Sequence, residues 1–388
     1  MIQINKKEAC CGCSACYNAC AHNAIAFDSD DEGFKYPKVI KDRCIDCGLC
    51  EKVCPIISRN GMPKREPSYK RIYACRLKDE DILLRSSSGG AFPAIALTVL
   101  KKGGVVIGAT YTSTMEVAHL VIETPDDLVK LQGSKYAQSN LNNVFRDIRS
   151  YLKSGRLVLF SGTPCQVDGL KHFLITDYPN LITVDIVCHA VASPKIFHDY
   201  VEYASKKHGD KVVWINMRDK EKRGWQHLFS QSFLFENKGS IIDSNKIIGW
   251  NYIYFSQYIN RPSCYECRYA NLDRPGDFTI SDLWDDNNTL PSFKDPRGAS
   301  MIMLNSDRAI GLFNDIKSII DFREISIETA LQPNLQRPTP AREDRGEFWF
   351  YYNRHGFSKS YKHFFKKKLT IRRFIKEVIN FVKIHTSK

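Results

Sequence analysis

The stretch Cys44-Ile45-Asp46-Cys47-Gly48-Leu49-Cys50-Glu51-Lys52-Val53-Cys54-Pro55 decides the fold of the first part of this chain. It follows the pattern C-x2-C-x2-C-x3-C-P, which is the ligand spacing of a cubane iron–sulfur cluster. Three thiolates two residues apart surround one face of the cluster, and the proline ends the local helix after the fourth. The stretch therefore predicts a small fold built around cluster ligands.

The same spacing occurs once more, nearer the start of the chain. Cys10, Cys13, Cys16 and Cys20 repeat it, with Ala21 in place of the proline. In two-cluster ferredoxins the fourth cysteine of each run binds the other cluster. We therefore expect two ligand sets: a first set of Cys10, Cys13, Cys16 and Cys54, and a second set of Cys44, Cys47, Cys50 and Cys20. A zinc ribbon, the alternative, uses paired C-x2-C units without the x3 step. The spacing gives the extra thiol, Cys11, no ligand role.

Composition limits the remaining possibilities. A chain of 388 residues with 43% hydrophobic residues predicts two or three domains with a sizeable core. No uninterrupted apolar stretch reaches 18 residues, so no transmembrane helix is expected, and the polar start carries no signal peptide. Most of the 14 cysteines stand at metal-ligand spacing, which predicts a reducing, cytoplasmic compartment.

The net charge of +13 is concentrated near the end of the sequence. Residues 357–388 contain ten Lys or Arg and one acidic residue. The basicity is thus a property of the tail and does not indicate a nucleic-acid-binding protein. Within the tail, apolar residues recur at helical spacing at positions 371, 374, 375, 378, 379 and 382. This pattern predicts a basic amphipathic helix that either makes peripheral contact with an anionic membrane or packs on the protein body.

Turn and linker signals divide the chain into four parts. Residues 1–58 are expected to form an α+β ferredoxin-like module that depends on its clusters for stability. Residues 59–68, which include two prolines, form a linker. Residues 69–330 alternate strands with helices, which predicts an α/β domain with a mainly parallel sheet. Residues 331–388 form a C-terminal extension that ends in the basic helix.

Two glycine-containing turns in the α/β part are candidate anion sites. Ser86-Ser87-Ser88-Gly89-Gly90 leads into an apolar helical pattern, and such a helix start offers free backbone N–H groups and the helix dipole to a phosphate. An ordinary serine N-cap is the alternative. Gly133-Ser134-Lys135-Tyr136 is the second turn. No G-x-G-x-x-G motif opens a helix, so a nicotinamide-type Rossmann site is not expected.

Four further cysteines stand at positions typical of a site: Cys165, Cys188, Cys264 and Cys267. The first two follow predicted strands, where α/β folds place their sites, and the last two form a C-x2-C pair. These four, the third set, fit a third cluster or a zinc site. A nucleophilic pair made of Cys188 and His189 would leave three of them unexplained. An electron chain with two clusters upstream favours a third cluster, whereas Cys75 is interpreted as a buried small hydrophobic residue.

Together these motifs resemble the family formed by the beta subunits of coenzyme F420-reducing hydrogenase and F(420)H(2) dehydrogenase. The resemblance covers about residues 1–320 and rests on the two glycine-containing turns, Gly162-Thr163-Pro164-Cys165-Gln166, Cys188-His189, Cys264/Cys267 and the segment from Gly276 to Trp284. It implies an FAD-containing reductase domain with a cubane cluster beside the flavin and a fused ferredoxin-type domain in front. Some bacterial relatives in this family are encoded with glycan-assembly enzymes, and this part of the resemblance points to a sugar- or lipid-linked substrate. By this resemblance the residues that contact FAD are Ser86, Ser87, Ser88, Gly89, Gly90, Gly133, Ser134, Lys135 and Tyr136.

The physics of electron transfer agrees with that interpretation, because clusters pass single electrons and a flavin converts them into pairs. Lys135, Arg218 and Lys220 are the candidates for neutralising a reduced flavin or an anionic substrate. Two function classes follow. One is an oxidoreductase that passes electrons between ferredoxin or another redox donor, its clusters, FAD and a small-molecule or glycan-linked substrate. The other is an electron-transfer subunit without a substrate site of its own. The sequence identifies no catalytic residue.

Overall fold

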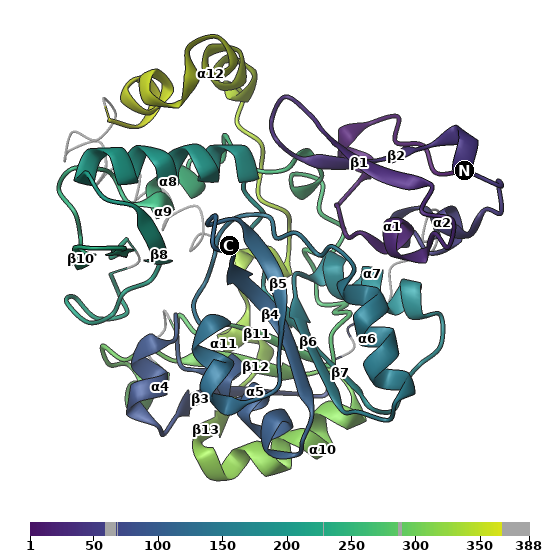
Figure 1. Cartoon of the computed structure of the whole chain (residues 1–388). Helices are drawn as coiled ribbons and strands as arrows, with labels where there is room; N and C mark the ends of the chain where they lie inside the picture. The colour runs from purple at the N-terminus through teal and green to yellow at the C-terminus, as the bar shows by residue number, and fades with distance from the viewer. Residues whose placement is uncertain (59–66, 68, 228, 286–288, 367–388) are drawn as a thin grey trace.

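An eight-stranded sheet forms the centre of the larger part of the chain. The computed structural model describes residues 1–388 except 59–66, 68, 228, 286–288 and 367–388 (Figure 1). The strands of the sheet are β3 (Arg71–Leu77), β4 (Val105–Tyr111), β5 (Val117–Ile122), β6 (Val158–Gly162), β7 (Leu181–Ile186), β11 (Phe278–Asp282), β12 (Ser300–Leu304) and β13 (Ile320–Glu324). Their order is β13-β3-β12-β11-β7-β6-β4-β5.

The sheet is parallel only in its centre. Strands β11, β7, β6 and β4 run parallel to one another. The flanking pairs β4–β5, β11–β12, β12–β3 and β3–β13 are antiparallel. The prediction of a mainly parallel sheet therefore holds only for the centre of a mixed sheet; the short connection from β4 to β5 can add only an antiparallel neighbour, and β3 joins near the other edge beside strands far along the chain.

Different helices cover the two faces of the sheet (Figure 1). Val106 and Leu159 pack on one face with α5 (Ala91–Lys101) and α10 (Asp307–Ile316). Their neighbours in sequence, Ile107 and Phe160, pack on the other face with α6 (Val144–Lys153) and α7 (Pro164–Leu174). This alternation follows from the period of two along a strand, and it leaves the central strands buried on both faces. Two short helices, α4 (Glu80–Arg85) and α11 (Ile327–Ala330), complete this layer structure.

A second hydrophobic core lies beside the large sheet. It is built from α8 (Pro194–His208), β8 (Val212–Asn216), β9 (Ser232–Phe235), β10 (Gly239–Ile242), α9 (Trp250–Tyr254), α12 (Arg345–Ser360) and a π-helix, η8 (Tyr361–Lys366). Strands β9 and β10 form an antiparallel hairpin. Strand β8 pairs with β9 rather than with the large sheet.

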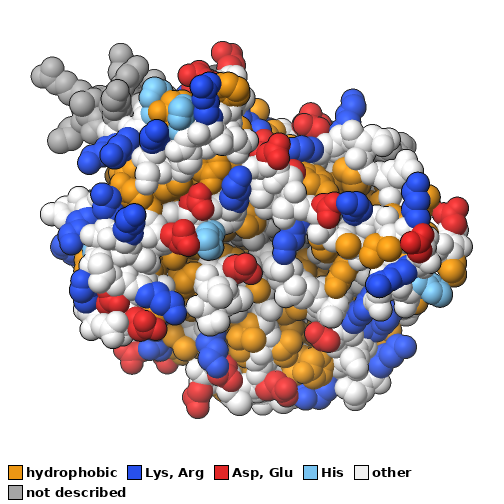
Figure 2. Space-filling view, turned by 45° about the horizontal axis from the view of Figure 1, so that its top comes forward, with side chains coloured by type: hydrophobic (Ala, Val, Ile, Leu, Met, Phe, Trp, Pro, Cys, Tyr) orange, Lys and Arg blue, Asp and Glu red, His pale blue; other side chains and the backbone are white. Residues whose placement is uncertain are grey.

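The C-terminal extension packs into this second core as far as it is described. Phe348, Trp349 and Phe365 are buried there, and Ile248 N donates a 2.6 Å hydrogen bond to the hydroxyl of Tyr361. The predicted amphipathic face, residues 371–382, lies outside the described residues. Among the helices that are described, none is long and apolar enough to cross a membrane. Figure 2 shows Lys and Arg interspersed with Asp and Glu over one face of the molecule.

The N-terminal module is small and contains little core. It comprises α1 (Ala15–Ala19), α2 (Leu49–Lys52), α3 (Pro55–Ser58) and the antiparallel pair β1 (Ile25–Ser29) and β2 (Lys35–Val39). Two of the four buried side chains of its separate core, Ile2, Cys16, Ile25 and Cys54, are cysteines. The module therefore depends on its cysteines where other domains use apolar side chains.

The module docks tightly on α7 and α8. A Cβ atom added to Gly169 of α7 would lie 2.7 Å from the Cβ of Cys13, so the Cys13 side chain packs against the helix backbone as closely as only a glycine permits. On the α8 side, Ser193 donates a hydrogen bond to the carbonyl of Glu32, whose carboxylate forms an ion pair with Arg345. These contacts fix the cysteines of the module against the α/β body.

Candidate functional site

Two neighbouring cavities mark the candidate site. The large cavity has a volume of about 720 Å³, and the smaller one, the cysteine cavity, about 180 Å³. Residues 188–191 and Asn334 line both. The segment that follows β7 is therefore the wall between them. The large cavity falls within the range of roughly 300–1,000 Å³ typical of small-molecule and cofactor sites.

The large cavity lies at the carboxyl ends of the parallel strands. Its lining includes residues 161–163 at the end of β6, 186–191 from the last residue of β7 onward, and 280–282 of β11. Aromatic side chains of α9, Tyr252 and Tyr254, also line the cavity. This is the position at which open α/β sheets bind their ligands.

The two glycine-containing turns meet at the large cavity. Ser134 N donates to Ser87 Oγ at 2.8 Å, and the two hydroxyl oxygens are 3.1 Å apart. Gly90, with a φ of +79°, is the N-cap of α5, and no side chain caps this helix. The alternative of a serine N-cap is therefore wrong, and the first N–H groups of α5 have no side-chain cap. The predicted contact residues that line the cavity are Ser86, Ser87, Ser88, Gly90, Gly133, Ser134, Lys135 and Tyr136.

Gly89, the remaining predicted contact residue, is not part of the lining. A Cβ atom at this position would lie 2.3 Å from Ser300 N and 2.5 Å from the carbonyl oxygen of Cys75. Gly89 thus lets the turn pass close to β12 and β3, and this packing is a sufficient reason for a glycine. Cys75 itself is fully buried in the sheet core, as predicted for a structural residue.

The two candidate lysines are occupied by backbone carbonyls. Lys135 Nζ donates to the carbonyls of Gln132 (2.7 Å) and Gly133 (3.0 Å), within its own turn. Lys220 Nζ donates to three carbonyls, including that of Ser88 at 2.8 Å. Burial lowers the pKa of each ammonium group to about 7. Both lysines therefore hold the turns in shape.

His119, on β5, is a lining residue that the sequence did not reveal. Its Nε2 lies 3.0 Å from the carbonyl oxygen of Ser161, and burial lowers its pKa to about 4. The ring is therefore neutral at pH 7, with Nε2 as donor. Nδ1 is buried and has no partner among the described residues. A single histidine in an alternating strand carries no sequence signal for such a place.

The third set converges on the cysteine cavity. Cys165 lies in the first turn of α7, Cys188 follows β7, and Cys264 ends the 3₁₀ helix η4 (Pro262–Cys264), with Cys267 close behind. All four line the cavity. Burial is the main cause that raises the pKa of Cys188, and the charges of the other three thiols raise it further. The fold thus brings together the four cysteines that their positions in the sequence predicted to form one site.

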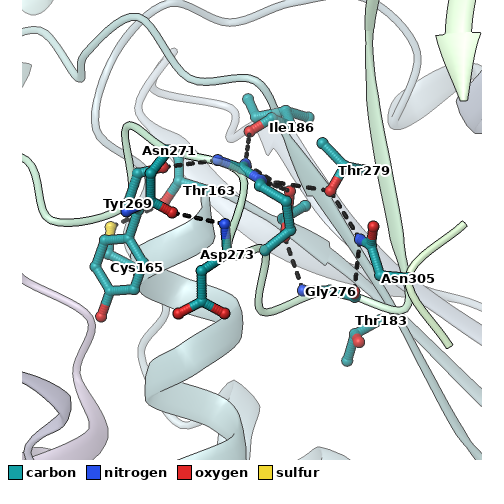
Figure 3. Close-up of polar contacts among 12 residues, drawn as sticks. Thr163, Cys165, Thr183, Ile186, Tyr269, Asn271, Asp273, Gly276, Thr279 and Asn305 are labelled. Carbon is teal, nitrogen blue, oxygen red and sulfur yellow. Dashed lines mark hydrogen bonds and ion pairs between the residues drawn. The ribbon is translucent and has the colours of Figure 1, made fainter. Parts of the chain in front are cut away.

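A buried ion pair holds the loop that carries Cys264 and Cys267. Arg274 Nη2 donates to Asp185 Oδ1 at 2.6 Å, with both side chains at most 1% exposed. Arg274 also donates to the carbonyls of Tyr269 (2.7 Å) and Ile186 (2.9 Å), which ties the loop to the end of β7. Figure 3 shows Tyr269 and Cys165 on one side of this network and Gly276 and Asn305 on the other.

Cys11 is a fifth thiol at the cysteine cavity. It lies between the module and the α/β body, next to Cys13 on one side and Cys165 on the other. The hydrogen bond with Cys11, together with burial, raises the pKa of Cys165. A spacing rule applied to the module alone could not place this residue beside the third set.

The first and second sets differ in exposure. Cys13, Cys16 and Cys54 of the first set are buried, whereas Cys47 of the second set is exposed beside Ile45, which is 64% exposed. Buried Arg261 reaches the first set from the α/β body, because its Nη2 donates to Cys10 Sγ at 3.6 Å. In the second set, Ile2 N donates to Cys50 Sγ and Ala24 N to Cys20 Sγ. N–H groups aimed at sulfur are typical of cluster ligands.

Sulfur spacing disfavours mononuclear zinc. A tetrahedral site with Zn–S distances of about 2.3 Å requires sulfurs about 3.8 Å apart. Within the described part of the chain, the one group of three or more potential ligands whose atoms all lie within 4.8 Å of one another is His198, Asp199 and Glu202, on α8. Among the described residues, no three sulfurs of a cysteine set all lie within 4.8 Å of one another.

The fold and the cysteine sets define the chain as an iron–sulfur redox protein, and comparisons with known proteins specify its family. Residues 9–56 match the 4Fe-4S dicluster domain. Residues 72–146 and 155–328 match the N-terminal and C-terminal models of the coenzyme F420 hydrogenase/dehydrogenase beta subunit, and together these two models span more than half of the chain. The chain belongs to this family, with a dicluster domain in front.

Individual relatives are distant. The chain is 28% identical over 177 residues to the coenzyme F420-dependent sulfite reductase of Methanocaldococcus jannaschii, covering 44% of this chain and 26% of that protein. It is 21% identical over 237 residues to one of the subunits of the F(420)H(2) dehydrogenase of Methanosarcina mazei, covering 56% and 62%. The matches thus span less than two thirds of these relatives. A chain of the F420-reducing NiFe hydrogenase complex from Methanosarcina barkeri, solved after xenon derivatization, aligns over 77% of this chain and 94% of its own, with a TM-score of 0.46 and 16% identity.

Proposed function

We propose that this chain is an iron–sulfur flavoprotein oxidoreductase that uses 4Fe-4S clusters and FAD. The observation that carries the proposal is the shared wall: residues 188–191 line both the cysteine cavity and the large cavity. A cluster on the third set and a flavin in the large cavity would be separated by one chain segment. Electron transfer between them needs such proximity.

The difference in exposure between the cysteine sets supports one direction of electron transfer through the module. The exposed second set, with Cys47 and Ile45 at the surface, is the proposed contact for ferredoxin or another redox donor. The buried first set lies between it and the α/β body, and Cys11 continues the line to the third set. The order of the sets would therefore be second, first, third and then the large cavity.

The lining of the large cavity fits FAD at both ends. The uncapped start of α5 and the hydroxyls of Ser87 and Ser134 suit its phosphates. Tyr252, Tyr254 and other aromatic side chains suit a flat ring and exclude water. Bound there, FAD supplies the conversion between single and paired electrons.

Iron, sulfide and flavin analysis of the anaerobically purified full chain tests the proposal. We expect about twelve irons, as three cubane clusters require, together with one FAD. Ser134→Trp should fill the cavity and lose flavin while iron is kept, whereas Ser154→Trp, at an exposed site beyond α6, should keep both. A chain that never binds flavin, or flavin retained in Ser134→Trp, would contradict it. Anaerobic reoxidation with glycan- and lipid-linked acceptors then separates an enzyme from an electron-transfer subunit.

A further inference from the structure

Arg218 is a buried guanidinium on the wall of the large cavity with incomplete hydrogen bonding. Its side chain is 4% exposed. Nη1 donates to Asp282 Oδ2 at 2.9 Å and is 3.5 Å from the hydroxyl of Tyr136. Nη2 is buried and finds no hydrogen-bond partner anywhere in the described part of the chain. Buried N–H donors are almost always paired in folded proteins, so this unpaired nitrogen points to a partner that the described chain does not supply.

Of the three candidate cations, Arg218 is the one with a buried nitrogen that has no hydrogen-bond partner among the described residues. The three protons of Lys220 are matched by three carbonyl oxygens. Lys135 is bound to two carbonyls of its own turn. Arg218 also remains charged at every relevant pH, since its carboxylate partner Asp282 raises its pKa further against the opposing effect of burial.

The charge of the lining indicates the chemistry of the ligand. Among the described charged side chains that line the large cavity, Arg218 and Arg342 are permanently cationic, Lys135 is partly protonated near pH 7 and Asp282 is anionic. The start of α5 adds the positive end of a helix dipole. An acceptor that carries negative charge therefore fits best.

We propose that Arg218 binds an oxyanion, a phosphate or carboxylate oxygen, through Nη2. Asp282 acts as a positioning residue that holds the guanidinium by Nη1 and leaves Nη2 directed to the ligand. The inference rests on the proposed function for the source of the oxyanion. That source is either the pyrophosphate of FAD or an anionic group of the substrate.

Two titrations of the full chain separate the sources. In the first, flavin-depleted protein is titrated with FAD by calorimetry. In the second, flavin-loaded protein is titrated with inorganic phosphate and with malonate, followed by flavin absorbance and by tryptophan fluorescence, because the ring of Trp225 lies 5.9 Å from the guanidinium of Arg218. The variants are Arg218→Gln and Arg218→Lys. Arg223→Gln is the matched control, since Arg223 is 54% exposed and pairs with Asp243.

Loss of a charge-assisted hydrogen bond should weaken binding about tenfold or more in Arg218→Gln. Arg218→Lys should be weakened less, because it keeps the charge and loses the planar fork. Weaker FAD binding assigns the oxyanion to the cofactor. Unchanged FAD binding with weaker phosphate or malonate binding assigns it to the substrate.

Unchanged affinities in both titrations, with either variant, would overturn the inference. If Arg218→Gln does not fold, Arg218→Lys alone decides. If the wild-type chain binds no FAD, the proposed function fails, and phosphate titration of the flavin-free chain still tests the oxyanion site through its dependence on Arg218.

Discussion

The cysteines of the module and those of the α/β body reach their places in opposite ways. The first and second sets come from two short runs of sequence, in helices of four or five residues and a core that includes Cys16 and Cys54. The third set comes from α7, the end of β7 and a separate loop, held by the buried pair of Arg274 and Asp185. In the module, the metal sites should hold the fold together. In the body, the fold holds the cysteines together.

Removal of one predicted ligand from each region is the strongest test of this difference between the module and the body. Cys264→Ser should lose the iron of the third site, about four of twelve atoms by the cubane stoichiometry, and leave the body folded. Cys50→Ser should lose iron and also unfold the module, because little other core supports it. Iron analysis with limited proteolysis of residues 1–58 measures both effects.

Cys11→Ser is the matched control for the third site. Cys11 lines the same cavity, but the ligand spacing gives it no role, so the variant should keep its iron. If Cys11→Ser loses iron while Cys264→Ser keeps it, Cys11 and not Cys264 is a ligand of the third site.

The buried ion pair tests whether the fold assembles the third set. Arg274→Met leaves the carboxylate of Asp185 buried without its charge partner, and breaking such a pair typically costs about 3–5 kcal/mol. We expect a lower thermal midpoint and loss of the iron of the third site, with the iron of the module retained. Arg297→Met removes an exposed pair with Asp295 and should have little effect. Equal effects of the two variants would refute the role of the Arg274 pair.

Sequence reasoning succeeded where local spacing decides the structure. The doubled cysteine run predicted a dicluster module because its spacing alone sets the ligand geometry, and residues 9–56 match such a domain. The two glycine-containing turns were recognised as separate motifs, and the fold joins them through Ser87 and Ser134. The parallel centre of the sheet followed from alternating strands and helices.

Sequence reasoning failed where contacts between distant segments decide the structure. The antiparallel flanks of the sheet, the lining residue His119 and the position of Cys11 beside Cys165 depend on segments far apart in the chain. Gly89 was grouped with its neighbours as a ligand contact because sequence alone does not distinguish a glycine that approaches a ligand from one that approaches a strand. Cys188 and His189 were singled out in the sequence, but the sequence did not predict that residues 188–191 line two cavities.

Acid should destabilise the α/β body through protonation of His119. The folded state lowers its pKa from 6.5 to about 4 by burial, so the unfolded chain binds more protons between these values. Stability should therefore fall as pH falls from about 6.5 towards 4, by up to roughly 3 kcal/mol at 1.36 kcal/mol per pH unit. His119→Gln keeps a donor for the Ser161 carbonyl and does not titrate. Denaturant unfolding from pH 7.5 to 5 should show a weaker pH dependence in this variant, and identical slopes would exclude His119 as a cause.

The smallest effect concerns the contact between the two regions. Gly169, inside α7, faces Cys13 of the module so closely that an added Cβ would lie 2.7 Å from the Cβ of Cys13. Gly311, inside α10, meets nothing within 4 Å. Alanine favours a helix over glycine by about 1 kcal/mol, so Gly311→Ala should be neutral or stabilising. Gly169→Ala should instead destabilise by about 1–3 kcal/mol, the usual cost of overpacking, and slow reduction of the third site by electrons that enter at the module. Thermal unfolding and stopped-flow reduction of the two variants measure this difference directly. If Gly169→Ala matches Gly311→Ala in both, the module and the body do not approach each other as the structure requires.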